Sequence, residues 1–266
     1  MQSFDEKTYW ENRLSKNFDI STSGYRPLGL DYNRWLYRLK ANKVKKVVTK
    51  YGTEIENANI LDIGSGTGFY IEFWSNLGAK KVTGLDITNI SVHNLQKKFP
   101  EYNFHRLNIA DPSIENKIDK KFSIIGAFDV LYHIVDDNQF YNAISNIKRL
   151  SDENCLLFIT DTFRHQSVKR SNYLVSRTLK TYLKILEKND FTVVERIPVF
   201  FLMNPPDEIS NRCLKWLFDF IWRYLFQLIQ RHGNVTGRIL YFIDTVLTYL
   251  FRESPTVELM VCKYSA

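Results

Sequence analysis

Residues 61–69 read Leu-Asp-Ile-Gly-Ser-Gly-Thr-Gly-Phe, and this stretch decides the fold. A short apolar run ends in three alternating glycines, after which a helical pattern begins at Phe69. Glycine permits the tight turn and lets a ligand approach the backbone closely. The start of the following helix offers free N–H groups to a ligand. The stretch therefore predicts a strand, a ligand-binding turn and a helix in succession.

The same alternation continues along the first 160 residues. Short runs typical of strands lie at 59–63, 81–86, 103–107, 121–128 and 155–160. Helical patterns separate them, such as 137–150, where apolar residues recur on one face and Asp136 or Asp137 can cap the start. Alternating strands and helices predict an α/β fold with a parallel sheet and helices on both faces.

An acid on the second strand narrows the choice of ligand. Asp86 ends the run 81–86, 22 residues beyond Gly64, and an acid there can accept hydrogen bonds from both hydroxyls of a ribose. The dinucleotide fingerprint G-x-G-x-x-G/A requires a small residue where this chain has Phe69. A nicotinamide oxidoreductase is therefore disfavoured, and the pattern that remains is acid-x-G-x-G-x-G.

At this point the sequence resembles the class I S-adenosylmethionine (SAM)-dependent methyltransferases. LDIGSGTGFY at 61–70 looks like the first motif of that family, and GLDIT at 84–88 like its second strand with the ribose-binding acid. NIAD at 108–111 resembles the third motif, although the family often has Asp at the position of Asn108. FSIIGAFDVLYHIVDD at 122–137 resembles the fourth strand and the loop that covers the methyl donor. The resemblance extends over about 55–165.

The resemblance implies that SAM binds at this turn and leaves as S-adenosylhomocysteine. It implies cofactor contacts for Asp62, Gly64, Ser65, Gly66, Gly68, Asp86, Ile87, Asn108, Ile109, Phe128 and Asp129. The glycines would pass close to the methionine part, Asp62 would help fix the turn, and Asp86 would bind the ribose. Residues 108–109 would face adenine, and residues 128–129 would lie near the sulfonium. The alternative is that these residues bind no ligand. The glycines would then only form a turn, and Asp86 would only cap a helix.

Histidines are the candidate bases, because an oxygen nucleophile gains from proton removal and histidine titrates near neutrality. His133 follows the fourth strand on the substrate side by resemblance; a packing role is the alternative. His165 lies beyond the fifth strand, where substrate loops often sit, and the alternative is a solvated loop residue. His93, His105 and His232 have the sequence context of surface or helix residues. No cluster of histidine and acids has metal-ligand spacing, so we expect no metal.

The expected architecture is one domain over 1–266 with a Rossmann-like, mostly parallel seven-stranded sheet. An N-terminal helical cap would occupy 1–54 and the SAM-binding core 55–165. The substrate side would occupy 166–266, with a two-helix insertion at about 206–254 between the last two strands. The family resemblance implies that the last strand is antiparallel.

The insertion is apolar around most of its circumference. Its helices are expected at 214–230 and 238–251, with a turn allowed by Gly233 and Gly237. A helix apolar on most sides must be buried on several of them. We therefore expect a packed helical hairpin, which could form a homodimer interface. A lid over an apolar substrate and a peripheral membrane or lipid contact through 214–251 are the alternatives.

Charge bears on the substrate. The 266 residues include 36 Lys and Arg against 29 Asp and Glu, a net charge of +7. Basic stretches at 26–50 and 163–188 flank the expected mouth and could attract a phosphate, a nucleotide-sugar or a lipid-linked glycan. A solvated cationic surface is the alternative. No recognised nucleic-acid module appears, so a small molecule is favoured over nucleic acid.

Cysteine usage and the termini indicate the compartment. Cys155, Cys213 and Cys262 are too few and too widely spaced for a disulfide framework or a zinc site. The opening MQSFDEKTYW has no signal pattern, and no apolar run reaches the roughly 18 residues of a spanning helix. These observations predict a cytoplasmic protein.

The predicted function is SAM-dependent methyl transfer (EC 2.1.1.-) to a small or medium-sized metabolite. Oxygen is favoured over nitrogen or carbon, and the acceptor is expected to be anionic or linked to a lipid or sugar. The alternatives are an RNA or protein methyltransferase and a non-catalytic SAM-binding subunit.

Overall fold

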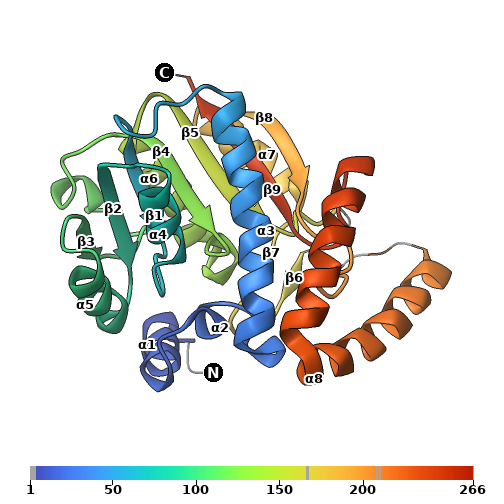
Figure 1. Cartoon of the computed structure of the whole chain (residues 1–266). Helices are drawn as coiled ribbons and strands as arrows, with labels where there is room; N and C mark the ends of the chain where they lie inside the picture. The colour runs from blue at the N-terminus through green and yellow to red at the C-terminus, as the bar shows by residue number, and fades with distance from the viewer. Residues whose placement is uncertain (1–3, 166–167, 208, 210, 266) are drawn as a thin grey trace.

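The computed structural model describes residues 4–165, 168–207, 209 and 211–265. A seven-stranded sheet in the order β3-β2-β1-β4-β5-β9-β8 forms its centre, with helices on both sides (Figure 1). The strands are β1 Asn59–Ile63, β2 Lys81–Asp86, β3 Asn103–Arg106, β4 Phe122–Phe128, β5 Ser151–Asp161, β8 Phe191–Pro198 and β9 Glu258–Tyr264. β9 runs antiparallel between β5 and β8, and the remaining pairs are parallel. The predicted fold class is confirmed.

Helices connect the strands where the apolar periodicity predicts them. They are α4 Phe69–Asn76, α5 Asn89–Lys98, α6 Asp137–Leu150 and α7 Leu179–Lys188. Short 3-10 turns occur at η1 Arg26–Leu28, η2 Ile114–Asn116 and η3 Leu131–His133, and a small hairpin joins β6 Lys169–Arg170 to β7 Val175–Ser176. The side chain of Asp136 accepts from the Gln139 N–H, which confirms the predicted cap of α6.

Buried side chains form one cluster on each face of the sheet. Alternation along a strand separates the clusters, because Ile60 points to one face and Leu61 to the other. The first cluster contains side chains of α3, α4 and α5, and the second contains those of α6 and α7. This layering leaves the carboxyl ends of the parallel strands at one edge, where ligands bind in open α/β sheets.

The N-terminal segment folds over that edge. It contains α1 Glu6–Lys16, α2 Ile20–Ser23 and α3 Gly29–Lys50; the predicted cap 1–54 also includes residues 1–3, which lie outside the described part. The carboxylate of Glu11 accepts from the backbone N–H groups of Asn89 (2.7 Å) and Ile90 (3.0 Å) at the start of α5. The Ser23 hydroxyl lies 3.1 Å from the Thr67 hydroxyl in the glycine turn. These contacts fix α1 and α2 above the sheet.

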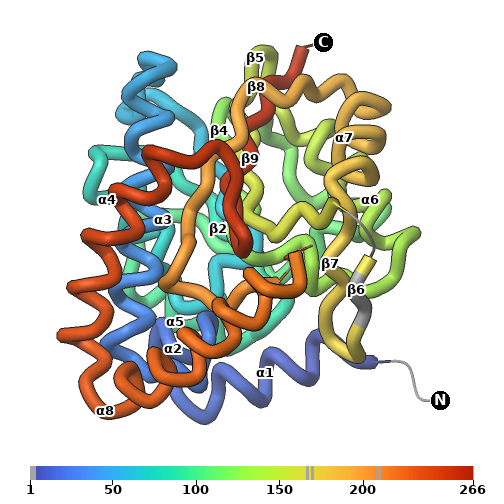
Figure 2. Tube along the Cα trace, turned by 90° about the vertical axis from the view of Figure 1, so that its right-hand side faces the viewer, coloured from blue at the N-terminus to red at the C-terminus, as the bar shows by residue number. Residues whose placement is uncertain are grey.

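The insertion differs from the expected packed hairpin. The two expected helices are present as the halves of α8 Arg212–Leu250, which meet in a bend at His232, the single residue inside α8 with non-helical angles (φ −139°, ψ 48°). The half after the bend lies beside α3, and the half before it diverges from the body (Figures 1 and 2). Gly237 is not a turn residue: a Cβ there would lie 2.5 Å from Cδ1 of Trp35, so close packing on α3 explains it.

The expected burial of the insertion on several sides is also wrong. Trp222 and Ile229 are buried in the first half, whereas Trp216 is 68% exposed. Among the residues that the structure describes, no helix is long and apolar enough to cross a bilayer.

Candidate functional site

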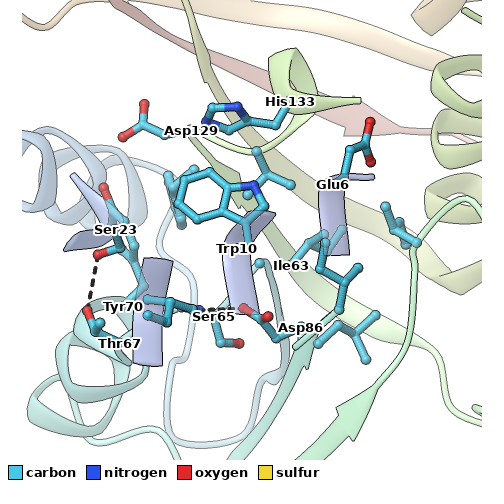
Figure 3. Close-up of a pocket in the computed structure, with 18 of the residues that line it drawn as sticks. Glu6, Trp10, Ser23, Ile63, Ser65, Thr67, Tyr70, Asp86, Asp129 and His133 are labelled. Atoms are coloured by element: carbon cyan, nitrogen blue, oxygen red, sulfur yellow. Dashed lines mark hydrogen bonds between the residues drawn. The ribbon is translucent and has the colours of Figure 1, made fainter. Parts of the chain in front are cut away.

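A cavity of about 120 Å³ lies at the carboxyl ends of β1, β2 and β4, covered by α1 (Figure 3). Residues from seven separate segments converge on it. Those predicted from the sequence are Gly64, Ser65, Gly66, Asp86, Ile87, Asn108, Ile109, Phe128, Asp129 and His133. The remaining three predicted residues, Asp62, Gly68 and His165, do not line it.

The three glycines of the turn serve different purposes. All have positive φ (70°, 50° and 83° for Gly64, Gly66 and Gly68), a region that favours glycine. A Cβ on Gly64 would lie 2.4 Å from the Val130 side chain, and one on Gly68 would lie 2.4 Å from that of Leu95. Of the three, only Gly66 has room for a Cβ. The nearest atom to such a Cβ would be Cβ of Ser23 at 3.4 Å, and Gly66 also lines the cavity. Gly66 is therefore the position where a side chain would fill space meant for a ligand.

Asp86 holds the turn and faces the cavity. Its carboxylate accepts from the Gly66 N–H (2.8 Å), the Thr88 N–H (2.9 Å) and the Thr88 hydroxyl (2.7 Å). A carboxylate has about four acceptor positions, so capacity remains for a ligand hydroxyl. Burial raises the pKa of Asp86 above its ordinary value.

Asp62 lies behind the cavity wall instead of on it. It is 2% exposed on β1, and burial raises the pKa of its carboxyl to about 8. The Ser65 hydroxyl donates to its backbone carbonyl at 3.1 Å. The geometry places Asp62 as a support of the turn.

The opposite end of the cavity suits a flat heterocycle. Ile87, Leu107 and Ile109 supply apolar surface. The Oδ1 of Asn108 accepts from the Ala110 N–H at 2.9 Å and keeps a second lone pair.

Tyr70 supplies an independent sign that a polar ligand belongs here. Its ring stacks on Phe128 with centroids 3.8 Å apart and planes at 15°, and both residues line the cavity. Its hydroxyl is buried and has no hydrogen-bond partner within the described part of the chain. A buried hydroxyl without a partner is costly, so a ligand group that bonds it would be stabilised. The residues present thus fit the polar end of an adenosyl amino acid.

A second, larger cavity of about 730 Å³ adjoins the first. The residues that line both are Trp10, Ser23, Tyr37, Asp129 and His133. The larger cavity also contains cationic side chains, namely Arg13, Lys16, Arg26 and Lys40. The five shared residues therefore form a junction between the smaller cavity and the larger cavity, which contains the basic side chains.

Comparison with known proteins agrees with this geometry. The family model described as a methyltransferase domain matches residues 60–154. The chain is 29% identical over 137 residues to the mitochondrial ubiquinone biosynthesis O-methyltransferase of Dictyostelium discoideum, covering 47% of this chain and 43% of that protein. It is 29% identical over 214 residues to the 23S rRNA (cytidine-2'-O)-methyltransferase TlyA of Campylobacter jejuni, covering 70% and 82%. Residues 60–154 of the chain therefore form a methyltransferase domain.

A solved structure agrees on the fold of this chain. Magnesium protoporphyrin IX methyltransferase from Synechocystis PCC 6803, solved with bound SAM, matches with a TM-score of 0.58 over 100% of both chains, at 14% identity. The matched segment spans less than half of the Dictyostelium protein. The described residues of this chain contain no group of three or more His, Cys, Asp or Glu that could hold a metal ion.

Asp129 occupies the junction in a strained conformation. Its φ is 59°, uncommon for a residue other than glycine and typical of functional sites. Its N–H donates to the Thr160 hydroxyl (2.8 Å), which in turn donates to its carboxylate (2.9 Å). The carboxylate also pairs with the ammonium of Lys40 from α3.

His133 is half-buried at the same junction, edge-on to Trp10 with ring centroids 4.9 Å apart. Burial lowers the pKa of His133 to about 4, so the ring is neutral at pH 7. Its Nδ1 lies 3.0 Å from the carbonyl oxygen of Tyr173. Because a carbonyl oxygen only accepts, Nδ1 carries the proton and Nε2 is left as an acceptor.

His165 is not brought to the junction. Its side chain is 50% exposed, lies 3.7 Å from the Glu253 carboxylate, and lines neither cavity. The solvated alternative describes it better, because half of its side-chain surface is exposed.

Several site residues escape sequence reasoning. Glu6, Trp10 and Leu14 from α1 line the smaller cavity, and only Trp10 lies within the stretch YWENR at 9–13. Asp161 lines the larger cavity, 1% exposed, and burial raises the pKa of its carboxyl to about 7. It accepts from the Tyr182 hydroxyl at 2.6 Å. Burial of an acid at a strand end is a tertiary property that no local pattern reveals.

Proposed function

We propose that this protein transfers the methyl group of SAM to a hydroxyl of a small or medium-sized anionic acceptor held in the larger cavity. The observation that carries the proposal is the junction of the two cavities at Trp10, Tyr37, Asp129 and His133. A near-attack arrangement needs donor and acceptor spaces that meet at one point in a water-poor site.

The donor site follows from the smaller cavity. Gly66 gives the methionine part its approach to the backbone, and the Tyr70 hydroxyl can bond its polar end. Asp86 has acceptor capacity for a ribose hydroxyl, and residues 107–109 border the adenine end. The donor supplies an electrophilic methyl carbon on its sulfonium sulfur.

The acceptor site takes its charge preference from Arg13. One of its terminal nitrogens donates to the Gly24 carbonyl at 2.7 Å, and its Nε is buried without a partner in the described residues. Lys16 and Arg26 line the same cavity. A guanidinium with an unused donor and neighbouring cations suits a phosphate or carboxylate.

His133 takes the proton in the proposed reaction. The acceptor oxygen forms a bond to the methyl carbon while the carbon–sulfur bond breaks, and the hydroxyl proton passes to Nε2 of His133. The Tyr173 carbonyl holds the tautomer that leaves Nε2 free to accept. The ring then carries the charge that the adjacent Asp129 carboxylate stabilises.

Calorimetry with S-adenosylhomocysteine tests the donor site. Wild type should bind it, and Asp86→Ala should weaken the affinity by roughly 1.5–3 kcal/mol, the scale of lost hydrogen bonds to a charged group. NADH should bind neither protein. An unchanged affinity in the variant would remove the ribose assignment, and the absence of any binding by wild type would remove the proposal.

A second candidate acceptor is RNA. The TlyA match covers 70% of this chain, and the net charge is +7. Tight binding of structured RNA that weakens steeply with salt would favour this candidate. Turnover of phosphorylated or carboxylated small hydroxyl compounds, followed by mass spectrometry, would favour the first.

A further inference from the structure

The outward sides of α8 carry a large apolar surface. In the half before the bend, Trp216, Phe220, Tyr224 and Leu228 recur every fourth residue and are 68%, 43%, 54% and 49% exposed. Trp222 and Ile229 occupy the other side and are buried. Figure 1 shows this half extending away from the body of the protein. Its apolar side therefore faces solvent.

The half after the bend presents a second apolar stripe. Val235, Ile239, Phe242, Val246 and Tyr249 follow a 4-3-4-3 spacing, which keeps them on one helical face. They are exposed, and Tyr249 reaches 87%.

The opposite face of that half is already used. The Lys43 ammonium on α3 donates to the Thr248 hydroxyl at 2.6 Å, and Asp244 accepts from backbone N–H groups of residues 201–203. The exposed stripe therefore does not take part in these contacts, which hold this half of α8 in place. Contiguous apolar surface of this extent marks an interaction site.

Charge identifies the partner. The exposed cations of α8 are Arg212, Lys215, Arg223, Arg231 and Arg238. Its acids are Asp219, paired with Lys215 at 2.5 Å, and the buried Asp244. In a symmetric dimer of this face, the same cations would meet across the axis. Anionic headgroups would instead neutralise them.

We propose that α8 docks this protein on the surface of an anionic lipid bilayer, with its exposed apolar side chains at the boundary between headgroups and acyl chains. An apolar face flanked by Lys and Arg is typical of a helix that lies in the interface, and α8 does not span it. Trp216, Tyr224 and Tyr249 have apolar rings with polar tips, which favour this depth. This surface is independent of the proposed methyl transfer.

Vesicle sedimentation tests the docking. Wild type should pellet with vesicles of phosphatidylcholine containing about 30% phosphatidylglycerol, and at least roughly tenfold less with phosphatidylcholine alone. The double variant Phe220→Glu/Phe242→Glu should lose at least roughly tenfold in binding to the anionic vesicles. Arg223→Glu/Arg238→Glu should do the same and should lessen the effect of added salt.

Matched controls lie on the opposite face of the sheet. Tyr141→Glu/Leu183→Glu changes residues that are 43% and 42% exposed on α6 and α7, and Lys184→Glu/Lys188→Glu removes exposed cations of α7. Both should bind vesicles like wild type, and all variants should keep the wild-type circular dichroism. Equal loss in the controls, or no binding by wild type, would overturn the proposal. A dimer that Phe220→Glu/Phe242→Glu dissociates, without vesicle binding, would assign the face to a second copy.

Discussion

The ammonium of Lys40 on α3 pairs with the carboxylate of Asp129 at the end of β4, where the two cavities meet. The two side chains are 9% and 15% exposed. The rings of Tyr37 and Phe200 lie 5.2 and 5.6 Å from the ammonium. Each charge therefore depends on the other because both side chains are largely buried, and the pair ties the N-terminal segment to the sheet.

Removing one partner of this pair should be costly. Lys40→Met leaves the Asp129 carboxylate without its counter-ion, and we expect the free energy of unfolding to fall by about 3–5 kcal/mol. Lys40→Met/Asp129→Asn should recover much of the loss, because no unpaired charge remains. Urea unfolding of the three proteins measures both effects. A double variant as unstable as the single one would contradict the role of charge.

Substitution of Gly66 should weaken ligand binding, whereas substitution of Gly52 should leave it unchanged. Both have positive φ (50° and 61°), so Ala at either position should cost about 1–2 kcal/mol of stability. A Cβ on Gly52 meets nothing within 4 Å, whereas Gly66 lines the cavity and a Cβ there would lie 3.4 Å from Cβ of Ser23, which lines it too. Gly66→Ala should lower the affinity for S-adenosylhomocysteine by at least roughly tenfold, the effect of filled ligand space. Calorimetry that finds equal affinities for the two variants would argue against the assigned wall.

Tyr70→Phe and Tyr102→Phe should have opposite effects. The Tyr70 hydroxyl lacks a partner, so its removal should leave stability unchanged or raise it by up to about 1 kcal/mol. The donor affinity should fall by about three- to tenfold, the worth of one hydrogen bond. The Tyr102 hydroxyl donates to the Ala79 carbonyl at 2.7 Å away from the cavity, so Tyr102→Phe should lose about 1 kcal/mol and keep the affinity. Thermal unfolding and calorimetry separate these outcomes.

The pH profile distinguishes His133 as the base from Asp161, the buried acid that lines the larger cavity. Burial lowers the pKa of His133 to about 4, so a reaction that uses its neutral ring should show a flat kcat/KM from pH 6 to pH 9. Burial raises the pKa of Asp161 to about 7, and a reaction that needs its carboxylate would slow as the pH falls below 7. We expect the flat profile and a loss of roughly 10²- to 10⁴-fold in His133→Gln. A tenfold fall per pH unit below 7 would transfer the role to Asp161.

Asp62 should make stability depend on pH in an unusual direction. Burial raises the pKa of its carboxyl from 3.8 to about 8, so the folded chain holds a proton there that the unfolded chain releases. Stability from this group is therefore present at low pH and is lost as the pH rises toward 8, by at most about 1.4 kcal/mol per unit. The difference in urea midpoint between wild type and Asp62→Asn should change between pH 6 and pH 8 and level off above. Parallel curves would contradict the raised pKa.

Local patterns were sufficient for the elements and for the outline of the donor site. The apolar run 59–63, the glycines of the turn and Asp86 are close in sequence or lie on neighbouring strands, so period and spacing predict their meeting. The same reasoning failed for α8. It assumed that an apolar helix must be covered by protein, whereas the structure leaves its outward sides exposed.

The sequence by itself determined the Rossmann-like sheet, the glycine turn and Asp86 on the next strand, because short-range periodicity and backbone conformation depend on neighbouring residues. Only the tertiary structure decided that α1 covers the donor cavity and that Lys40 meets Asp129. It also decided that Asp161 is buried, that His165 lies outside the site and that α8 bends at His232. Burial, pairing of distant charges and the pKa values that follow depend on contacts between segments far apart in the chain, and no local pattern encodes them.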